Sequence, residues 1–218
     1  GLPFSPEREG LSWREFLSRH ADVLLCSDLF TKEIWTFCGL RTAYVFFVIH
    51  LESRTILLAE ATFSPNSRWM QQQIRNLLWE CEERKITPRF LLHDGDGCFS
   101  PDFDAVLRRV GITPVKTPFR APNANAYAER WIRSIRQECL THLILFGLKS
   151  LQRALRQYKR FFNEHRPHQG IDNEIPECLL QQDVVGERVW CNDAIGPEQV
   201  KCDEYLGGLL KSYSRKAA

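Results

Sequence analysis

The spacing of hydrophobic positions changes along the chain, and it predicts the order of the secondary-structure elements. An amphipathic pattern over residues 13–20 indicates a short helix. The apolar run over residues 22–28 that follows is typical of a strand buried on both faces, and it ends on the carboxylate of Asp28. Two β-rich runs, residues 41–50 and 54–62, come next with three residues between them. We therefore expect three antiparallel strands at the start of the fold.

The middle of the chain alternates between helix and strand patterns. Turn-forming residues 64–67 precede apolar positions at helical spacing that continue to about residue 84. A strand, a helix and a further strand are predicted over residues 89–93, 103–110 and 112–116. This order of elements predicts an α/β fold with a mixed five-stranded sheet flanked by helices.

The remaining pattern is mostly helical. A loop rich in Pro and Asn over residues 117–125 leads into a predicted long helix over residues 126–145, and a second helix follows over residues 150–163. Beyond residue 178 only weak strand patterns occur, such as residues 187–191. We expect a C-terminal helical extension of the core and a small tail.

Length and composition limit the number of domains. With 218 residues, of which 44% are hydrophobic, the chain can bury one substantial core. We predict a lead-in helix within residues 1–20, a core over residues 21–176 and a tail, with short strands, over residues 177–218. Because no run of about 18 apolar residues occurs and the first residues lack the pattern of a signal peptide, we expect neither membrane insertion nor secretion.

Charge is unevenly distributed, although the formal net charge is only +2. Residues 107–168 carry 13 Lys and Arg against 3 Asp and Glu. Such a segment beside an acidic remainder is typical of a polyanion-binding face, although an ordinary solvated helix surface can have the same composition. The 8 cysteines form no Cys-x-x-Cys pair, which argues against a zinc cage or a disulfide framework.

Three carboxylates stand where two predicted strands and a helix end or begin: Asp28, Asp94 and Glu129. Two-metal phosphoryl transfer needs such a group, because acidic oxygens must hold two ions about 3.5–4 Å apart. Mg²⁺ prefers oxygen ligands and keeps several waters, so three carboxylates without a Cys or His cage are sufficient. Oxygen ligands also favour Mg²⁺ or Mn²⁺ over Zn²⁺.

The segments around these acids resemble the three acidic motifs of the retroviral-integrase superfamily, and in particular those of bacterial insertion-sequence transposases with an integrase core. They are residues 26–30 (CSDLF), 93–99 (HDGDGCF) and 121–130 (APNANAYAER). In that family a strand aspartate, an aspartate after the fourth strand and a helix glutamate form the triad, the last two about 35 positions apart. Asp94 and Glu129 are 35 positions apart.

Further segments extend the resemblance. Residues 158–171 (YKRFFNEHRPHQGI), followed by Pro176, are similar to the end of the family's core, and residues 206–213 resemble its tails. The likeness spans about residues 12–218, and residues 120–176 are its most specific part.

The resemblance implies an RNase H-like fold and a DDE-type polynucleotidyl transferase that cleaves DNA 3′ ends and joins them to target DNA. Asp28, Asp94 and Glu129 would be the catalytic ligands of two Mg²⁺ or Mn²⁺ ions. Asp28 would bridge the two ions. Transposon ends and target DNA would be the partners, with a homo-oligomer assembled on DNA. The implied location is cytoplasmic and nucleoid-associated, and a missing upstream helix-turn-helix region would recognise the DNA ends.

Basic and amide side chains near Glu129 are the candidate DNA contacts, because a phosphate backbone would lie along the helix face that bears the glutamate. The six candidates are Arg120, Asn123, Asn125, Arg130, Arg133 and Arg136. A simple surface ion pair between Glu129 and Arg133 is the structural alternative.

Several alternatives stay open at this point. A nuclease of the same fold that only hydrolyses DNA would need the same acids, and a domesticated, inactive DNA-binding module would retain the basic face. Asp96 could support Asp94 at the metal site. A calcium loop is excluded because Cys98 and Phe99 occupy the positions that need an oxygen ligand and a glycine. We expect His165 and His168 to be hydrogen-bonded structural residues.

Overall fold

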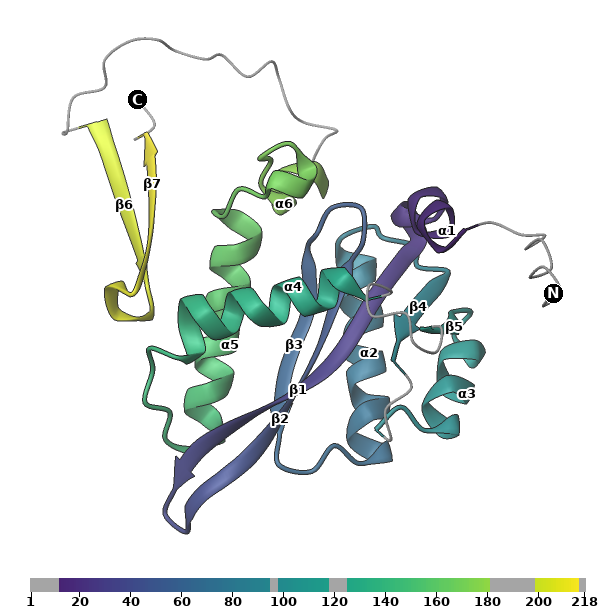
Figure 1. The fold of residues 1–218 in the computed structure, drawn as a ribbon, viewed down its shortest axis with the longest axis horizontal. Helices are drawn as coiled ribbons and strands as arrows, with labels where there is room; N and C mark the ends of the chain where they lie inside the picture. The colour runs from purple at the N-terminus through teal and green to yellow at the C-terminus, as the bar shows by residue number, and fades with distance from the viewer. Residues whose placement is uncertain (1–11, 95–97, 118–124, 181–198, 216–218) are drawn as a thin grey trace, which may run out of the picture.

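A computed structural model describes residues 12–94, 98–117, 125–180 and 199–215. Its centre is a five-stranded sheet in the order β3-β2-β1-β4-β5, with helices on both faces (Figure 1). The strands are β1 (Leu24–Thr36), β2 (Gly39–His50), β3 (Ile56–Thr62), β4 (Phe90–His93) and β5 (Thr113–Lys116). The helices are α1 (Trp13–Arg19), α2 (Ser67–Glu83), α3 (Pro101–Arg109), α4 (Ala126–Ile135), α5 (Gly147–Glu164) and α6 (Pro176–Leu180). The α/β fold with a mixed five-stranded sheet is confirmed.

The direction of the strands divides the sheet at β1. β1, β2 and β3 pair antiparallel, as predicted, whereas β4 and β5 pair parallel to β1 and to each other. Parallel strands need crossover connections, and α2 and α3 supply them. β1 is thus the strand where the two halves of the sheet meet.

β1 differs from the prediction, because it does not end at Asp28. It continues to Thr36, and the whole continuation pairs with β2, from Leu29 opposite Phe46 to Thr36 opposite Gly39. Phe30 and Ile34 bury their side chains along this stretch, which keeps it on the core. Asp28 therefore lies inside a long strand, just past the residues that pair with β4.

Local chemistry explains where the helices begin. Ser12 and Glu15 form a reciprocal capping box at α1, Asn66 caps α2 through the backbone amide of Trp69, and Ser100 caps α3 through that of Phe103. The predicted helix over residues 126–145 is shorter in the structure. α4 ends at Ile135 and a π-helical turn, Arg136–Leu140, follows it.

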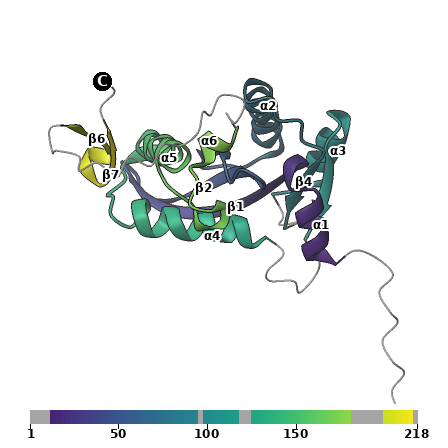
Figure 2. The same cartoon turned by 90° about the horizontal axis from the view of Figure 1, so that it is seen from above.

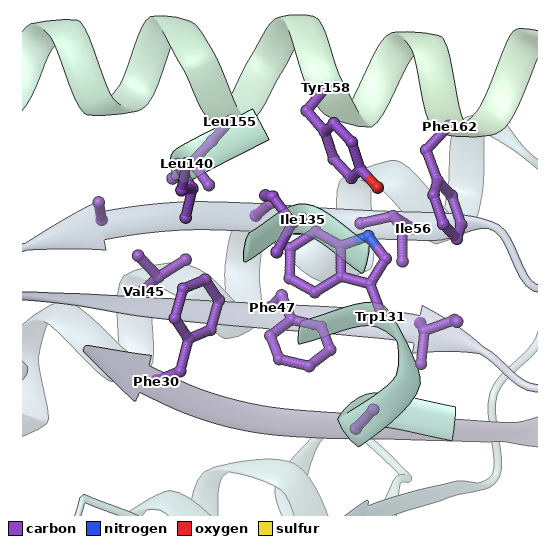
Figure 3. Packing of buried hydrophobic residues seen from close by; sticks show 14 of the residues in the cluster. Phe30, Val45, Phe47, Ile56, Trp131, Ile135, Leu140, Leu155, Tyr158 and Phe162 are labelled. Carbon is purple, nitrogen blue, oxygen red and sulfur yellow. The ribbon is translucent and has the colours of Figure 1, made fainter. Parts of the chain in front are cut away.

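The two faces of the sheet carry separate hydrophobic clusters, since successive strand residues point to opposite faces. One cluster packs α4 and α5 on the sheet and includes Phe47, Trp131 and Tyr158 (Figure 3). The other packs α2 and α3 on the opposite face and includes Phe46 and Phe103. Figure 2 shows the sheet between α4 on one side and α2 on the other.

The C-terminal part forms a separate small sheet. β6 (Val200–Tyr205) and β7 (Leu210–Arg215) pair antiparallel beside α5 (Figure 1). The hairpin contacts α5 through Tyr205, whose hydroxyl lies 2.6 Å from His165 Nε2, and through Leu206, whose amide donates to Gln157. The weak strand pattern at residues 187–191 lies outside the described residues. Across the described ranges, no helix is long and apolar enough to cross a membrane.

Candidate active site

The register of β1 and β4 determines the relation between the first two predicted acids. Leu24, Leu25 and Cys26 pair with Phe90, Leu91 and Leu92 in parallel register. The same offset makes Asp28 level with Asp94, one residue beyond the end of β4. Asp28 is half-buried and Asp94 is exposed. Two carboxylates therefore stand on neighbouring strands at the same height, at the edge where β4 ends.

A buried amide connects the start of α4 to this edge. Asn125, which is 6% exposed, donates from Nδ2 to the carbonyl oxygen of Ser27 at 3.0 Å. Ser27 in turn donates from Oγ to the carbonyl oxygen of Leu92. The residue before Asp28 is thus bonded both to β4 and to the N-terminus of α4.

Glu129 lies in the first turn of α4, where its backbone amide donates to the Asn125 carbonyl oxygen. α4 then follows β1, because Arg136, just past its C-terminal end, donates to the Thr31 carbonyl oxygen and stacks on Phe30. The glutamate is exposed, as are most polar side chains of this helix. The N-terminal end of α4, rather than its C-terminal end, is therefore the part that lies beside Ser27 and Asp28.

The donor chemistry fits a magnesium-type ion, since Asp28, Asp94 and Glu129 offer only oxygen atoms. In addition, Oδ1 of Asn125 is a buried amide oxygen without a hydrogen-bond partner in the described chain. Within residues 12–94, 98–117, 125–180 and 199–215, however, no three His, Cys, Asp or Glu side chains gather closely enough to hold a metal ion. The geometry thus brings the two aspartates level and leaves the glutamate on the adjoining helix.

A buried pair supports the strand end that carries Asp94. His93 is fully buried, and its Nε2 lies 3.1 Å from Asp104 Oδ1 on α3. Burial lowers the pKa of His93, and the neighbouring Asp104 opposes that shift. Phe99 stacks on the imidazole at 4.6 Å between ring centroids. These contacts fix the backbone immediately before Asp94.

α4 presents two different exposed sides. Glu129, Arg133 and Arg136 line a shallow hollow of about 340 Å³ together with Ile132 and Gln137. Tyr127, Arg130, Trp131 and Ser134 line another hollow, of about 670 Å³, on the next side of the helix. Because neighbouring residues of a helix are about 100° apart, Arg130 does not share the side that carries Glu129.

Comparisons with known proteins find similarity to integrase cores. The family model described as integrase core domain matches residues 110–176, a stretch that includes Glu129 and ends before the tail. The chain is also similar in structure to the catalytic core domain of BIV integrase, with a TM-score of 0.50, 14% identity, and coverage of 72% of this chain and 94% of that chain. The chain thus has the fold of these catalytic cores, and residues 110–176 match the model of the integrase core domain.

Two further solved structures share this fold. The catalytic domain of Mos1 mariner transposase has a TM-score of 0.57 and 13% identity, over 78% of this chain and 85% of that one. The HTLV-2 integrase catalytic core domain in complex with magnesium has a TM-score of 0.52 and 10% identity, over 73% and 96%. No curated protein matches the sequence. The RNase H-like fold predicted for this chain is confirmed.

The six predicted DNA contacts have different surroundings. Arg130, Arg133 and Arg136 are exposed, whereas Asn125 is buried against Ser27 and is directed into the protein. Arg120 and Asn123 lie outside the described residues, as does Asp96. The structure therefore presents three arginines on the surface and gives Asn125 a structural bond.

Residues of the segment 158–171 connect α5 and the turn after it to other parts of the fold. Tyr158 donates its hydroxyl to Glu138 at 2.8 Å, and Arg166 binds the same carboxylate at 2.6 Å. Asn163 is buried and exchanges two hydrogen bonds with the backbone of Ile56 on β3. His165 is hydrogen-bonded to Tyr205, as expected of a structural residue.

Sequence reasoning missed Arg54, which lines the larger hollow beside α4. Its guanidinium lies over the Tyr127 ring at 3.9 Å from the centroid. Arg54 belongs to the turn between β2 and β3, far from α4 in the chain. Only the packing of the turn against α4 brings it to the site, and no motif in the sequence indicated that packing.

Proposed function

We propose that this chain is a metal-dependent DNA transposase or integrase, which cleaves DNA at 3′ ends and joins those ends to target DNA. Asp28, Asp94 and Glu129 are the proposed catalytic ligands of two Mg²⁺ or Mn²⁺ ions. The proposed activity is that of a polynucleotidyl transferase, with cleavage followed by strand transfer.

The observation that carries the proposal is the shared level of Asp28 and Asp94 on the parallel pair of β1 and β4. Carboxylates at one height on neighbouring strands can bind a common ion with their oxygen atoms. The hydrogen bond from Asn125 to Ser27 holds the first turn of α4, and so Glu129, beside the same edge. The solved structure of the HTLV-2 integrase catalytic core domain is in complex with magnesium, which supports Mg²⁺ as the ion.

Each of the chain's own groups has a part in the proposed reaction. Ions held by these acids would lower the pKa of an attacking water or 3′-hydroxyl and stabilise the leaving oxygen. Asp28 provides a metal ligand from β1. The His93–Asp104 pair keeps the end of β4, and with it Asp94, in position. Arg133 and Arg136 bind the DNA backbone along the Glu129 side of α4. In-line displacement needs no covalent enzyme intermediate.

DNA ends and target DNA are the proposed partners, and the working form is a homo-oligomer. The basic excess of α4 and α5 supports a polyanion partner. One of the similar structures, the HTLV-2 core, is a dimeric form, which supports self-association.

The test is a gel assay of labelled 3′-hydroxyl oligonucleotides from the element's ends with a plasmid target, in Mg²⁺ or Mn²⁺. Asp28→Asn and Asp94→Asn should each abolish cleaved and joined products, because each loses the charge that holds the ions. Asp102→Asn is the matched control: this exposed aspartate on α3 lies outside the proposed site, and the variant should retain full activity.

The products also separate the alternatives. Cleaved DNA without joined DNA would identify a nuclease, and DNA binding without either product would identify an inactive binding module. Full joining by Asp28→Asn or Asp94→Asn would refute the assignment of the site.

A further inference from the structure

A hollow of about 670 Å³ beside α4 is lined by residues from three separate segments. We call it the arginine pocket and define it by Arg54, Tyr127, Arg130, Arg166 and His168. Arg54 comes from the turn between β2 and β3, Tyr127 and Arg130 come from α4, and the last two follow α5. No Asp or Glu of the described chain lines it.

The charge in the arginine pocket is only partly balanced. Arg166 is paired with Glu138 at 2.6 Å, but across the described segments neither Arg54 nor Arg130 has a carboxylate within salt-bridge distance. Burial lowers the pKa of Arg54, and the nearby Arg130 cation acts in the same direction. Cations that face one another without counter-charges are costly unless an anion joins them. The arrangement therefore favours an anionic ligand.

Arg54 is held in a defined position, and Arg130 lies near it. Arg54 has a left-handed backbone with φ of 62°, lies over the Tyr127 ring and donates from Nη1 to the Leu51 carbonyl oxygen. Arg130 Nη1 lies beside Gly170, where an added Cβ would be 3.9 Å away. Planar guanidinium groups suit the oxygens of a phosphate, and the defined position of Arg54 reduces the entropy lost on binding.

Neutral polar groups complete the lining. Burial first, and then Arg166, lowers the pKa of His168 to about 4, so its imidazole is neutral near pH 7 and adds no further charge. Its Nε2 lies 3.4 Å from the Phe162 carbonyl oxygen. The positive charge of the pocket therefore comes from arginines alone.

We propose that the arginine pocket binds a backbone phosphate of the DNA strand that reacts at Glu129. This inference rests on the proposed function and adds a binding site to it. Arg130 is adjacent to Glu129 in α4 but on the next side of the helix, so a strand that passes Glu129 can place a neighbouring phosphate against Arg130 and Arg54. A contact of this kind fixes the register of the strand without reading its sequence.

The experiment is fluorescence anisotropy of a labelled oligonucleotide with the full chain in EDTA, over a series of salt concentrations. Arg130→Gln should weaken binding several-fold for all sequences and reduce the slope of log affinity against log salt by about one. Arg75→Gln is the matched control, since Arg75 is exposed on α2, on the opposite face of the sheet. This control should bind as the wild type does.

Arg54 needs a second kind of variant because it is half-buried. Arg54→Lys keeps the charge but loses the planar fork, and it should weaken DNA binding while thermal unfolding shows an intact fold. An unchanged affinity and salt slope in both Arg130→Gln and Arg54→Lys would overturn the proposal. An equal loss in Arg75→Gln would also overturn it, because the effect would then be one of total charge.

Competition with inorganic phosphate distinguishes the source of the anion. If Arg130→Gln weakens phosphate binding but leaves DNA binding unchanged, the pocket holds a free anion and the proposal fails. Because EDTA removes the ions needed for chemistry, these results do not depend on catalysis. Failure of the strand-transfer assay would count against the proposed function, whereas an unchanged salt slope would count against the pocket.

Discussion

The two helical layers of this protein cover the same sheet but carry different charge. On α3, acids occupy the first turn and bases the last, an arrangement that stabilises an isolated helix through its dipole. On α2, Arg84 is paired with Glu80 and with Glu177 of α6. The α4–α5 layer instead carries arginines along its length, and most have no carboxylate partner in the described chain. The charges of the first layer are balanced within it, whereas the basic excess of the second favours a partner with negative charge.

The largest expected effect is the loss of stability when a tryptophan is replaced by alanine in one layer or the other. Trp131 of α4 is fully buried, and its ring lies 4.2 Å from that of Phe47 between centroids (Figure 3). Trp131→Ala should reduce the free energy of unfolding by about 3–5 kcal/mol, because it leaves a cavity under α4. Trp79 of α2 is 67% exposed, so Trp79→Ala should cost at most about 0.5 kcal/mol.

Urea unfolding followed by circular dichroism measures both values. Equal losses for Trp131→Ala and Trp79→Ala would contradict the difference in burial. A loss at Trp131 below about 1 kcal/mol would mean that α4 is not packed on the sheet as described.

A smaller effect concerns how the free energy of unfolding depends on pH. It arises at His168, whose charged form is disfavoured in the folded chain. The pKa of His168 is lowered from 6.5 to about 4 by burial and by Arg166. Burial also lowers the pKa of His93, but there Asp104 opposes the shift. Between pH 6.5 and about pH 4, the unfolded chain binds a proton at His168 and the folded chain does not. The free energy of unfolding should therefore fall as the pH drops from 6.5 to about 4.

His168→Gln removes the titrating group and should lose part of that fall. Urea titrations at several pH values in this window, on wild type and variant, give the comparison. Parallel curves for the two proteins would show that His168 is protonated alike in the folded and unfolded states.

Hydrophobic spacing predicted the fold well, because β1 to β4 and α2 to α5 each bury hydrophobic side chains on the sheet. The parallel register of β1 and β4, which makes Asp28 level with Asp94, became visible only in the structure. The extension of β1 to Thr36 was missed because its burial depends on pairing with β2. The end of α4 at Ile135 was missed because the π-helical turn after it keeps the apolar positions of a helix.

The candidate site was less accessible to sequence reasoning. The resemblance identified the three acids by motif and spacing, but it could not show that Asn125 is buried against Ser27. Nor could it reveal Arg54, which reaches Tyr127 only through tertiary packing. Contacts between distant segments depend on the register of the strands and the placement of α4, which no local pattern specifies.

Strand transfer by Glu129→Gln is the most direct test of the central claim, that the first turn of α4 completes an acidic site on β1 and β4. The assay compares joined products of the wild type, Glu129→Gln and the control Glu82→Gln, an exposed glutamate near the end of α2. The account predicts joining by wild type and Glu82→Gln, and none by Glu129→Gln, with DNA binding retained in all three. Joining by Glu129→Gln at the wild-type level would contradict it.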